Sequence, residues 1–101
     1  MKGKVLLVDD EPNIRDLVAA VLQREYQVSE AESGAALQKA FTDMPQPDVV
    51  VLDVKLRDAS GLDLLPLIKK RWADTEVIML TGMGTMEMAL EAGRLGAFTF
   101  L

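Results

Sequence analysis

The 101-residue chain contains no cysteine and no histidine. It therefore has no thiol nucleophile, no thiolate ligand for zinc and no imidazole that could act as a general base or metal ligand. Basic residues are also few: 11 lysines and arginines stand against 16 aspartates and glutamates, a net charge of -5. This balance excludes the basic footprint that nucleic acid or an anionic membrane requires, so we expect direct contact with neither. Any bound metal must take oxygen ligands.

A long hydrophobic run is also lacking. After Met1-Lys2-Gly3-Lys4, only four apolar residues precede two aspartates, too few for a secretory signal or a membrane span. We therefore expect a cytoplasmic protein. Because the length and the ordinary hydrophobic content suit one small domain, we expect residues 1–101 to share a single core.

Short apolar runs alternate with segments of helical period, which is typical of repeated βα units around a parallel sheet. Strands are expected at residues 5–8, 27–31, 49–52, 77–80 and 97–101. The first, third and fourth of these runs are apolar throughout, as expected for central strands covered by helices on both faces. The pattern predicts an α/β fold.

The intervening segments carry helix signals. The first has an apolar face made of Ile14, Leu17, Val18, Val21 and Leu22. Pro12 suits its first turn, Ser33 precedes a second helix, and Ser60 can cap a third. Pro66 lies inside the third helix, where it removes a hydrogen-bond donor and is expected to bend the helix. A fourth helix is predicted from about residue 85 to residue 95.

Polar residues follow the central strands where a ligand of an open α/β sheet binds, beyond the carboxyl ends. The first strand is followed by Asp9 and Asp10, the third by Asp53, and the fourth by Thr81 and Gly82. Carboxyl groups ordinarily have a pKa of about 4, so three of them in one pocket would ionise and repel one another. Magnesium (Mg2+) would relieve this repulsion through oxygen ligands. An ionised aspartate beside it could attack phosphorus without a histidine base, and the expected product is an aspartyl phosphate.

Each of these residues also has a purely structural interpretation. An aspartate at a strand end more often caps the next helix or starts a turn than binds a ligand. The indication of a site comes from the combination of these residues on three strands.

Five motifs spread along the chain are Val5-Leu-Leu-Val-Asp-Asp-Glu-Pro12, Val51-Leu-Asp53, Ser60-Gly61, Leu80-Thr-Gly82 and Leu95-Gly-Ala-Phe-Thr-Phe-Leu101. In composition and spacing they resemble the receiver domain of bacterial two-component response regulators. The resemblance implies a flavodoxin-like, doubly wound α/β fold with a parallel five-stranded sheet in the order 2-1-3-4-5. The segment 81–101 is most similar to receivers of sigma-54-dependent transcriptional activators.

The resemblance also implies roles for the acidic residues. Asp53 would be the phosphoacceptor, and the phosphoryl donor would be a phosphohistidine on a sensor histidine kinase. Asp10 would bind Mg2+ directly, Asp9 would act largely through water, and the backbone carbonyl of Lys55 would be a further ligand.

A switch is implied as well. Thr81 would bond a phosphoryl oxygen, Gly82 would leave the backbone open near the phosphate, and Phe100 would swing inward when Thr81 moves. The output would change the face formed by the fourth helix and fifth strand, where a homodimer or other self-association is expected. Such a domain is a phosphorylation switch in transcription regulation, and it is not an enzyme beyond promoting its own phosphorylation and dephosphorylation.

Two departures from the family pattern are visible. Arg57 stands where the family often has proline, so we expect a less rigid loop there. The family's active-site lysine would come two positions after Leu101, followed by a proline and a fifth helix, so the domain is expected to be incomplete at its C-terminus. We then expect self-association or marginal stability, and a weak response to phosphorylation.

Other phosphate-handling classes fit less well. A haloacid dehalogenase phosphatase needs a second aspartate at the position of Lys55, and a P-loop protein needs a glycine-rich loop where Asp9 and Asp10 stand. The alternative that stays open is a receiver-like interaction module that is not regulated by phosphorylation.

Overall fold

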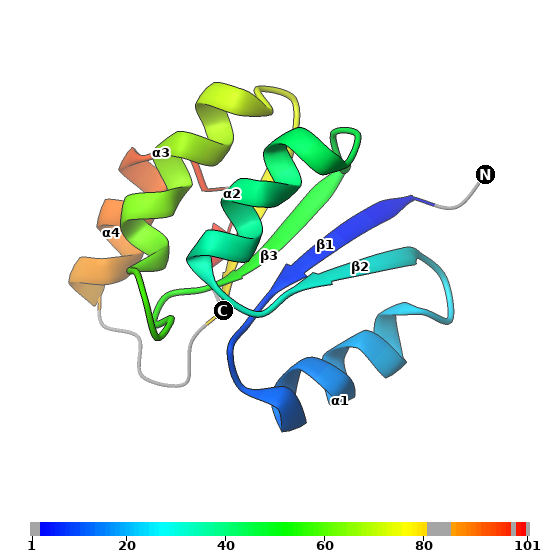
Figure 1. Cartoon of the computed structure of the whole chain (residues 1–101). Helices are drawn as coiled ribbons and strands as arrows, with labels where there is room; N and C mark the ends of the chain where they lie inside the picture. The colour runs from blue at the N-terminus through cyan, green and yellow to red at the C-terminus, as the bar shows by residue number, and fades with distance from the viewer. Residues whose placement is uncertain (1–2, 81–85, 98, 101) are drawn as a thin grey trace.

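The computed structural model describes residues 3–80, 86–97 and 99–100, in which strands and helices alternate along the chain (Figure 1). The elements are β1 (Lys4–Val8), α1 (Pro12–Leu22), β2 (Gln27–Ala31), α2 (Gly34–Asp43), β3 (Val49–Asp53), α3 (Gly61–Arg71), β4 (Glu76–Leu80), α4 (Met86–Arg94) and β5 (Thr99–Phe100). The strands form one parallel sheet in the order β2-β1-β3-β4-β5. The expected α/β architecture with a parallel sheet is therefore confirmed.

Some predicted boundaries need correction. Asp53 was expected just after the third strand and is the last residue of β3. Among the described residues of the predicted strand at 97–101, Thr99 and Phe100 pair with Ile78 and Met79 of β4. Ala97 lies before β5, whereas residues 85, 98 and 101 lie outside the described residues. These differences arise at element ends, where pairing to a neighbour decides the boundary.

The predicted cap of α3 by Ser60 is confirmed, and Ser33, which was predicted to precede the second helix, also caps α2. The Oγ of Ser33 accepts a hydrogen bond from the Ala36 N–H at 3.0 Å, and the Oγ of Ser60 accepts one from the Leu62 N–H at 3.2 Å. Each serine thus binds a backbone donor that has no partner within the first helical turn. The helix α3 continues through Pro66 to Arg71. The expected bend at Pro66 stays a prediction.

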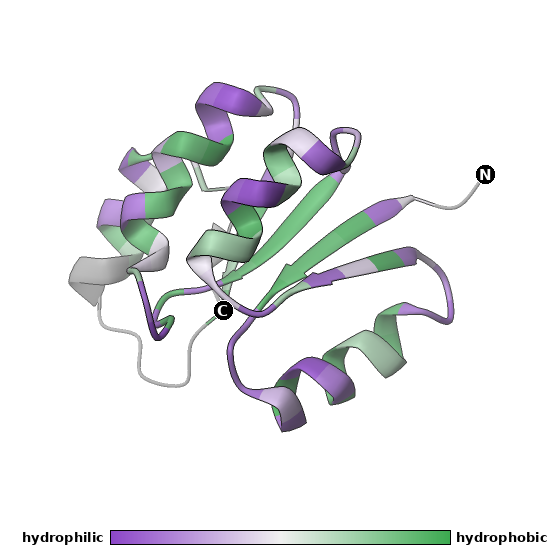
Figure 2. Cartoon of the chain, viewed as in Figure 1, coloured by the Kyte–Doolittle hydropathy of each residue, from purple (hydrophilic) through white to green (hydrophobic). Residues whose placement is uncertain are grey.

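The larger part of the core lies between the sheet and the helices α2, α3 and α4. Alternate residues of the strands point to this face; those buried in it include Leu6, Val8, Val50, Leu52, Val77 and Met79. They meet fully buried side chains of the helices, among them Leu37, Leu65 and Ile68. The apolar colouring of β1 and β3 in Figure 2 follows this burial.

The opposite face of the sheet is covered by α1, which lies alone on that side among the described elements (Figure 1). Its buried residues are Val5, Leu7, Ala19 and Val51, with Val18 and Leu22 partly buried against them. The predicted apolar face of α1 is buried only in part, since Ile14, Leu17 and Val21 are exposed. The apolar stripe is wider than the surface that α1 applies to the sheet.

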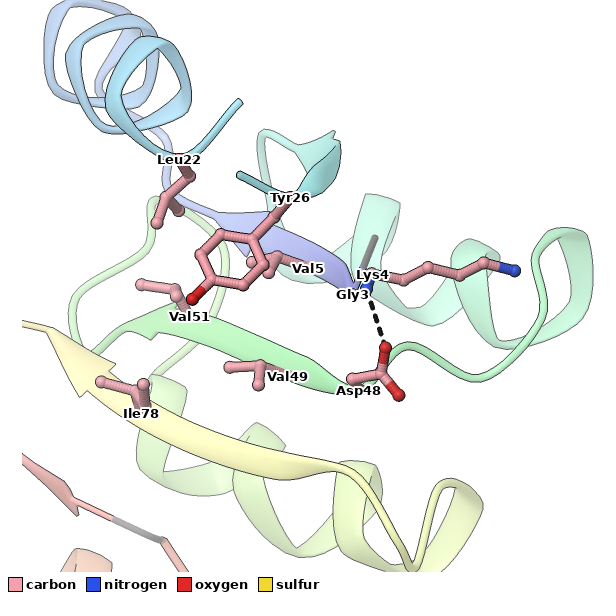
Figure 3. A pocket seen from close by; sticks show the side chains of 9 residues that line it. All are labelled: Gly3, Lys4, Val5, Leu22, Tyr26, Asp48, Val49, Val51 and Ile78. Carbon is pink, nitrogen blue, oxygen red and sulfur yellow. Dashed lines mark hydrogen bonds between the residues drawn. The ribbon is translucent and has the colours of Figure 1, made fainter. Parts of the chain in front are cut away.

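An apolar pocket of 210 Å³ opens beside α1, toward the amino ends of β1 and β3. Figure 3 shows Tyr26 and Leu22 on one side of it and Val49, Val51 and Ile78 on the other. The pocket therefore lies at the opposite end of the strands from the aspartates, which are at the carboxyl ends. None of the helices in residues 3–80 and 86–97 is long and apolar enough to cross a membrane.

Candidate functional site

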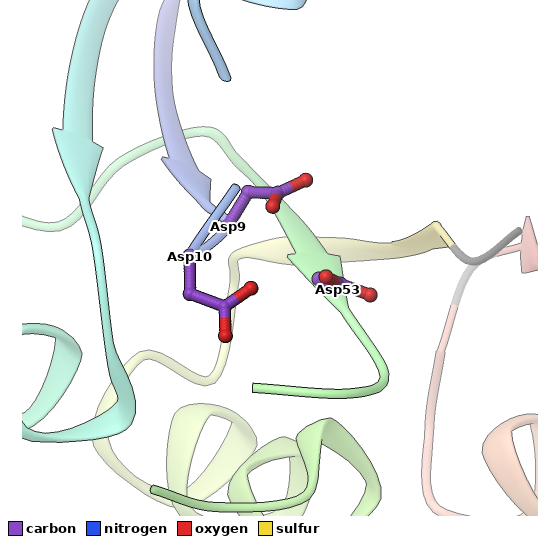
Figure 4. Close-up of side chains that lie close together, drawn as sticks. All are labelled: Asp9, Asp10 and Asp53. Atoms are coloured by element: carbon purple, nitrogen blue, oxygen red, sulfur yellow. The ribbon is translucent and has the colours of Figure 1, made fainter. Parts of the chain in front are cut away.

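The carboxyl ends of the two central strands bring Asp9, Asp10 and Asp53 together. Because Val8 of β1 is paired with Leu52 of β3, the residues that follow them lie next to one another. One carboxylate oxygen from each aspartate lies within 4.8 Å of the other two. Figure 4 shows Asp9 and Asp10 following β1 beside Asp53 on β3. The structure thus places the three predicted carboxylates in one cluster.

Asp9 is held from several sides and is only 3% exposed. Its Oδ1 accepts a hydrogen bond from the Glu11 N–H at 2.9 Å, which starts the turn into α1. Its backbone N–H donates to the Ala31 carbonyl at 3.1 Å, and its carbonyl accepts from Nη1 of Arg15 at 2.8 Å. Asp9 therefore has the structural role common at strand ends, in addition to its place in the cluster.

Arg15 was not singled out by sequence analysis. Besides the carbonyl of Asp9, this largely buried side chain contacts Glu30 of β2, with Nε 3.2 Å from Oε1. It thus joins α1 to the ends of β1 and β2. The sequence indicates this role of Arg15 only through its position: it is a basic residue in the first turn of a helix that follows two aspartates.

Asp53 is half-buried at the end of β3, and its Oδ1 accepts a hydrogen bond from the Lys55 N–H at 3.2 Å. Burial raises the pKa of Asp53, and repulsion from Asp9 and Asp10 raises it further, against the opposing effect of the Lys55 N–H. The ionised form of Asp53 is thus destabilised where it stands. A cation placed among the three carboxylates would stabilise that form.

The loop that follows Asp53 folds back on itself. Lys55 pairs with Ser60 in an antiparallel bridge, and the Gly61 N–H donates to the Val54 carbonyl at 2.6 Å. A Cβ on Gly61 would lie 2.3 Å from the backbone oxygen of Asp53. Only glycine fits there without moving the backbone that carries the candidate phosphoacceptor.

Asp58, at the tip of this loop, reaches the first turn of α2. Its Oδ1 accepts a hydrogen bond from the Gly34 N–H at 2.8 Å, and its Oδ2 accepts one from the Ala35 N–H at 3.0 Å. These N–H groups hold the pKa of Asp58 below its ordinary value. The loop for which Arg57 predicted less rigidity is therefore tied to α2. Sequence analysis missed this contact, whose only signal was an acidic residue in the loop.

The remaining predicted site residues are placed only in part. Thr81 and Gly82 lie outside the described residues, directly after Leu80, the last residue of β4. Phe100 belongs to β5, where its backbone is paired with Met79. Lys55 lies in the loop beside Asp53, so its backbone is near the cluster.

The donor set suits a hard divalent cation. It consists of carboxylate oxygens, without the nitrogen and sulfur donors that favour zinc. Two oxygens bound to one Mg2+ at about 2.1 Å would be about 3–4 Å apart. The observed spacing of up to 4.8 Å is slightly wider, so small side-chain movements would complete the geometry. The cluster could therefore hold a divalent metal.

Comparison with known proteins agrees with this fold. The response regulator receiver domain family matches residues 5–101. The chain therefore belongs to the family of response regulator receiver domains, which are signalling switches of two-component systems.

Three relatives illustrate the similarity. The chain is 36% identical over 100 residues to the response regulator protein PilR of Pseudomonas aeruginosa, a match that covers 99% of this chain and 22% of PilR. The crystal structure of NtrX from Brucella abortus matches with a TM-score of 0.89 and 38% identity, covering 100% of this chain and 23% of that one. A response regulator from Burkholderia pseudomallei, solved with a phosphorylated aspartic acid, a calcium ion and citrate, matches with a TM-score of 0.92 and 25% identity over 99% of this chain and 59% of that one.

The relatives are longer proteins. The chain spans between 21% and 54% of the length of the curated relatives it matches.

Proposed function

We propose that this chain is a phosphoacceptor receiver domain, which takes a phosphoryl group from a sensor histidine kinase onto Asp53 in the presence of Mg2+. The observation that carries the proposal is the cluster of Asp9, Asp10 and Asp53 at the carboxyl ends of β1 and β3. The related Burkholderia protein, solved with a phosphorylated aspartic acid and a calcium ion, supports it. So does the strand order, which suits a flavodoxin-like, doubly wound sheet whose ligands bind at this end.

The surroundings of the three aspartates favour Asp53 as the acceptor. Asp9 is almost fully buried and one of its oxygens is engaged by the Glu11 N–H. Asp53 is more accessible, and its Oδ1 is oriented by the Lys55 N–H. We therefore assign the nucleophile to Asp53 and metal binding to Asp10, Asp53 and the backbone carbonyl of Lys55, with Asp9 acting largely through water.

In the proposed reaction, a carboxylate oxygen of Asp53 attacks the phosphorus of a phosphohistidine. The new O–P bond forms as the P–N bond breaks, and the imidazole of the kinase leaves with the electron pair of that bond. Bound Mg2+ would supply positive charge that offsets the carboxylates and the phosphoryl oxygens. Asp9, through its bonds to Glu11 and Arg15, keeps the turn after β1 in place beside the acceptor.

The switch is proposed to begin at the end of β4. Leu80 is paired with Asp53, and the Val54 N–H donates to the Leu80 carbonyl at 3.3 Å. Thr81 follows Leu80 directly, which suits its proposed bond to a phosphoryl oxygen, with Gly82 next to it and Phe100 responding on β5. The change would reach the face of α4 and β5, where we propose the homodimer contact.

The wider setting is also a proposal. We infer a cytoplasmic regulator of transcription, and the segment 81–101 favours receivers of sigma-54-dependent activators. The stimulus would arrive through the sensor kinase.

Phosphorylation with a small acyl phosphate tests the proposal. The chain is incubated with the donor and Mg2+, and the mass of the intact protein is measured. We expect one phosphoryl group on the wild type, none on Asp53→Asn, and wild-type labelling of the control Asp63→Asn, which removes an exposed carboxylate from α3. Labelling of Asp53→Asn at the wild-type level would contradict the assignment. An unlabelled wild type would favour the alternative, an interaction module that is not regulated by phosphorylation.

A further inference from the structure

The first turn of α2 is capped twice, from two different parts of the chain. Ser33, the residue before the helix, accepts from the Ala36 N–H. Asp58, which is 24 positions away from Gly34, accepts from the Gly34 and Ala35 N–H groups. Ser33 acts within its own helix, whereas Asp58 ties that helix to the loop after β3.

The start of α2 also lies against the loop tip. A Cβ on Gly34 would be 3.0 Å from the Cβ of Ala59 and 3.2 Å from Oδ1 of Asp58. Glycine at the first position of α2 thus permits an approach that a side chain would hinder. The hydrogen bonds and the packing hold the tip of the loop from the same side.

The other end of the loop holds Asp53. From the tip, the chain returns through Ser60, which is bridged to Lys55, and the Lys55 N–H donates to Oδ1 of Asp53. A displacement of the tip would therefore be passed to the donor that orients the Asp53 carboxylate. The same residue carries the carbonyl proposed as a metal ligand.

We infer that Asp58 is a positioning residue for the Asp53 site, because it anchors the loop that carries Lys55 to the first turn of α2. This inference rests on the proposed function of Asp53. The lowered pKa of Asp58 agrees with it, because its two N–H partners stabilise the ionised form that makes both bonds. Residues that orient a functional group without touching the substrate act through such bonds.

The test compares Asp58→Ala with Ser33→Ala, which removes the other cap of the same helix and keeps the Asp58 carboxylate that bonds Gly34 and Ala35. A third variant, Asp58→Asn, keeps one acceptor oxygen. Three quantities are measured at a temperature well below every melting midpoint. They are the phosphorylation rate at saturating acyl phosphate and Mg2+, the Mg2+ concentration that gives half of that rate, and the exchange rates of the Lys55 and Ala36 amide hydrogens.

We expect Asp58→Ala to lower the saturated phosphorylation rate or the Mg2+ affinity by about tenfold, as is usual when a residue that supports a site is lost. Exchange at Lys55 should become faster in this variant. Ser33→Ala should lower the melting midpoint and speed exchange at Ala36, with phosphorylation and Lys55 unchanged. Asp58→Asn should lie between the wild type and Asp58→Ala, and it decides the question if Asp58→Ala does not fold.

Equal phosphorylation rates, Mg2+ requirements and Lys55 exchange in Asp58→Ala and Ser33→Ala would overturn the inference and reduce Asp58 to a helix cap. The proposed function fails in a different way, through a wild type that takes no phosphoryl group. In that case Lys55 exchange still decides whether Asp58 anchors the loop.

Discussion

The two faces of the sheet are built from helices of similar amphipathic pattern, yet they are buried to very different extents. On the face covered by α2, α3 and α4, Leu65 and Ile68 of α3 are fully buried. On the face covered by α1, Leu17 is 64% exposed and Val21 is 59% exposed. Apolar spacing alone therefore does not establish burial. Burial of apolar area is the main source of folding stability. The face covered by α2, α3 and α4 therefore contributes most of the stability of the described fold.

The largest contrast should appear in a pair of leucine substitutions. Leu65→Ala removes a fully buried side chain from α3 and should lower the free energy of unfolding by about 3 kcal/mol. Leu17→Ala removes an exposed side chain from α1 and should change it by no more than about 0.5 kcal/mol. Urea denaturation of both variants measures the difference. Equal losses would mean that the α1 face is covered in solution.

Two glycine substitutions on the better-packed face should change the free energy of unfolding in opposite directions. Gly61→Ala places a methyl group against the backbone of Asp53 and should cost about 2 kcal/mol of unfolding free energy. Gly93→Ala in α4 meets nothing within 4 Å and should stabilise the fold by up to about 1 kcal/mol, because alanine favours helix. Melting curves of the two variants test these changes in stability. Phosphorylation by acyl phosphate should also be slower in Gly61→Ala than in the wild type. Destabilisation by Gly93→Ala would contradict the open surroundings of that residue.

Magnesium should bind at the carboxyl ends of β1 and β3, at one end of the sheet between its two faces. At ten times its dissociation constant it should raise the unfolding free energy by about 1.4 kcal/mol through binding to the native state. Asp10→Asn should remove most of this gain. Asp43→Asn, an exposed residue at the far end of α2, should keep it. A melting midpoint that ignores Mg2+, or an Asp10→Asn variant that responds like the wild type, would contradict the metal site.

Substitution of Asp53 should stabilise the protein without metal. Since its pKa is raised in the fold, ionised Asp53 lowers stability once the pH exceeds that raised value, and the penalty vanishes below the ordinary value of 3.8. Asp53→Asn should therefore melt above the wild type at neutral pH, and the difference should disappear on acidification. Melting curves from pH 3 to pH 7 without divalent metal provide the measurement. A lower midpoint at neutral pH would show that Asp53 is stabilised by partners other than those described here.

The smallest effect is expected at Asp58, whose pKa shift has the opposite sign. Its stabilising bonds are fully present above the ordinary value of 3.8 and are lost as the pH falls through the lowered value in the fold. Asp58→Asn should melt slightly below the wild type at neutral pH, with the gap closing in acid. The effect is small because the group is exposed to solvent. A gap that widens in acid would contradict the assigned bonds.

Much of the site could be predicted from local sequence signals. Asp9, Asp10 and Asp53 could be placed at one end of the sheet because parallel strands end on the same side and the polar residues follow apolar runs directly. The link between Asp58 and α2 could not be placed in this way. It joins Gly34 and Asp58 across 24 positions, and nothing in either segment specifies the partner.

The sequence by itself determined the alternation of strands and helices, the place of Ser33 before α2, the cap at Ser60, and the strand ends that carry the acidic residues. These features depend on periodicity and on contacts within a few positions, which the chain encodes locally. Only the tertiary structure decided which part of the α1 stripe is buried, that Arg15 joins Asp9 to Glu30, and that Asp58 anchors the loop after Asp53. Burial and hydrogen bonding between distant segments depend on how the elements are packed, and that packing is a property of the whole fold.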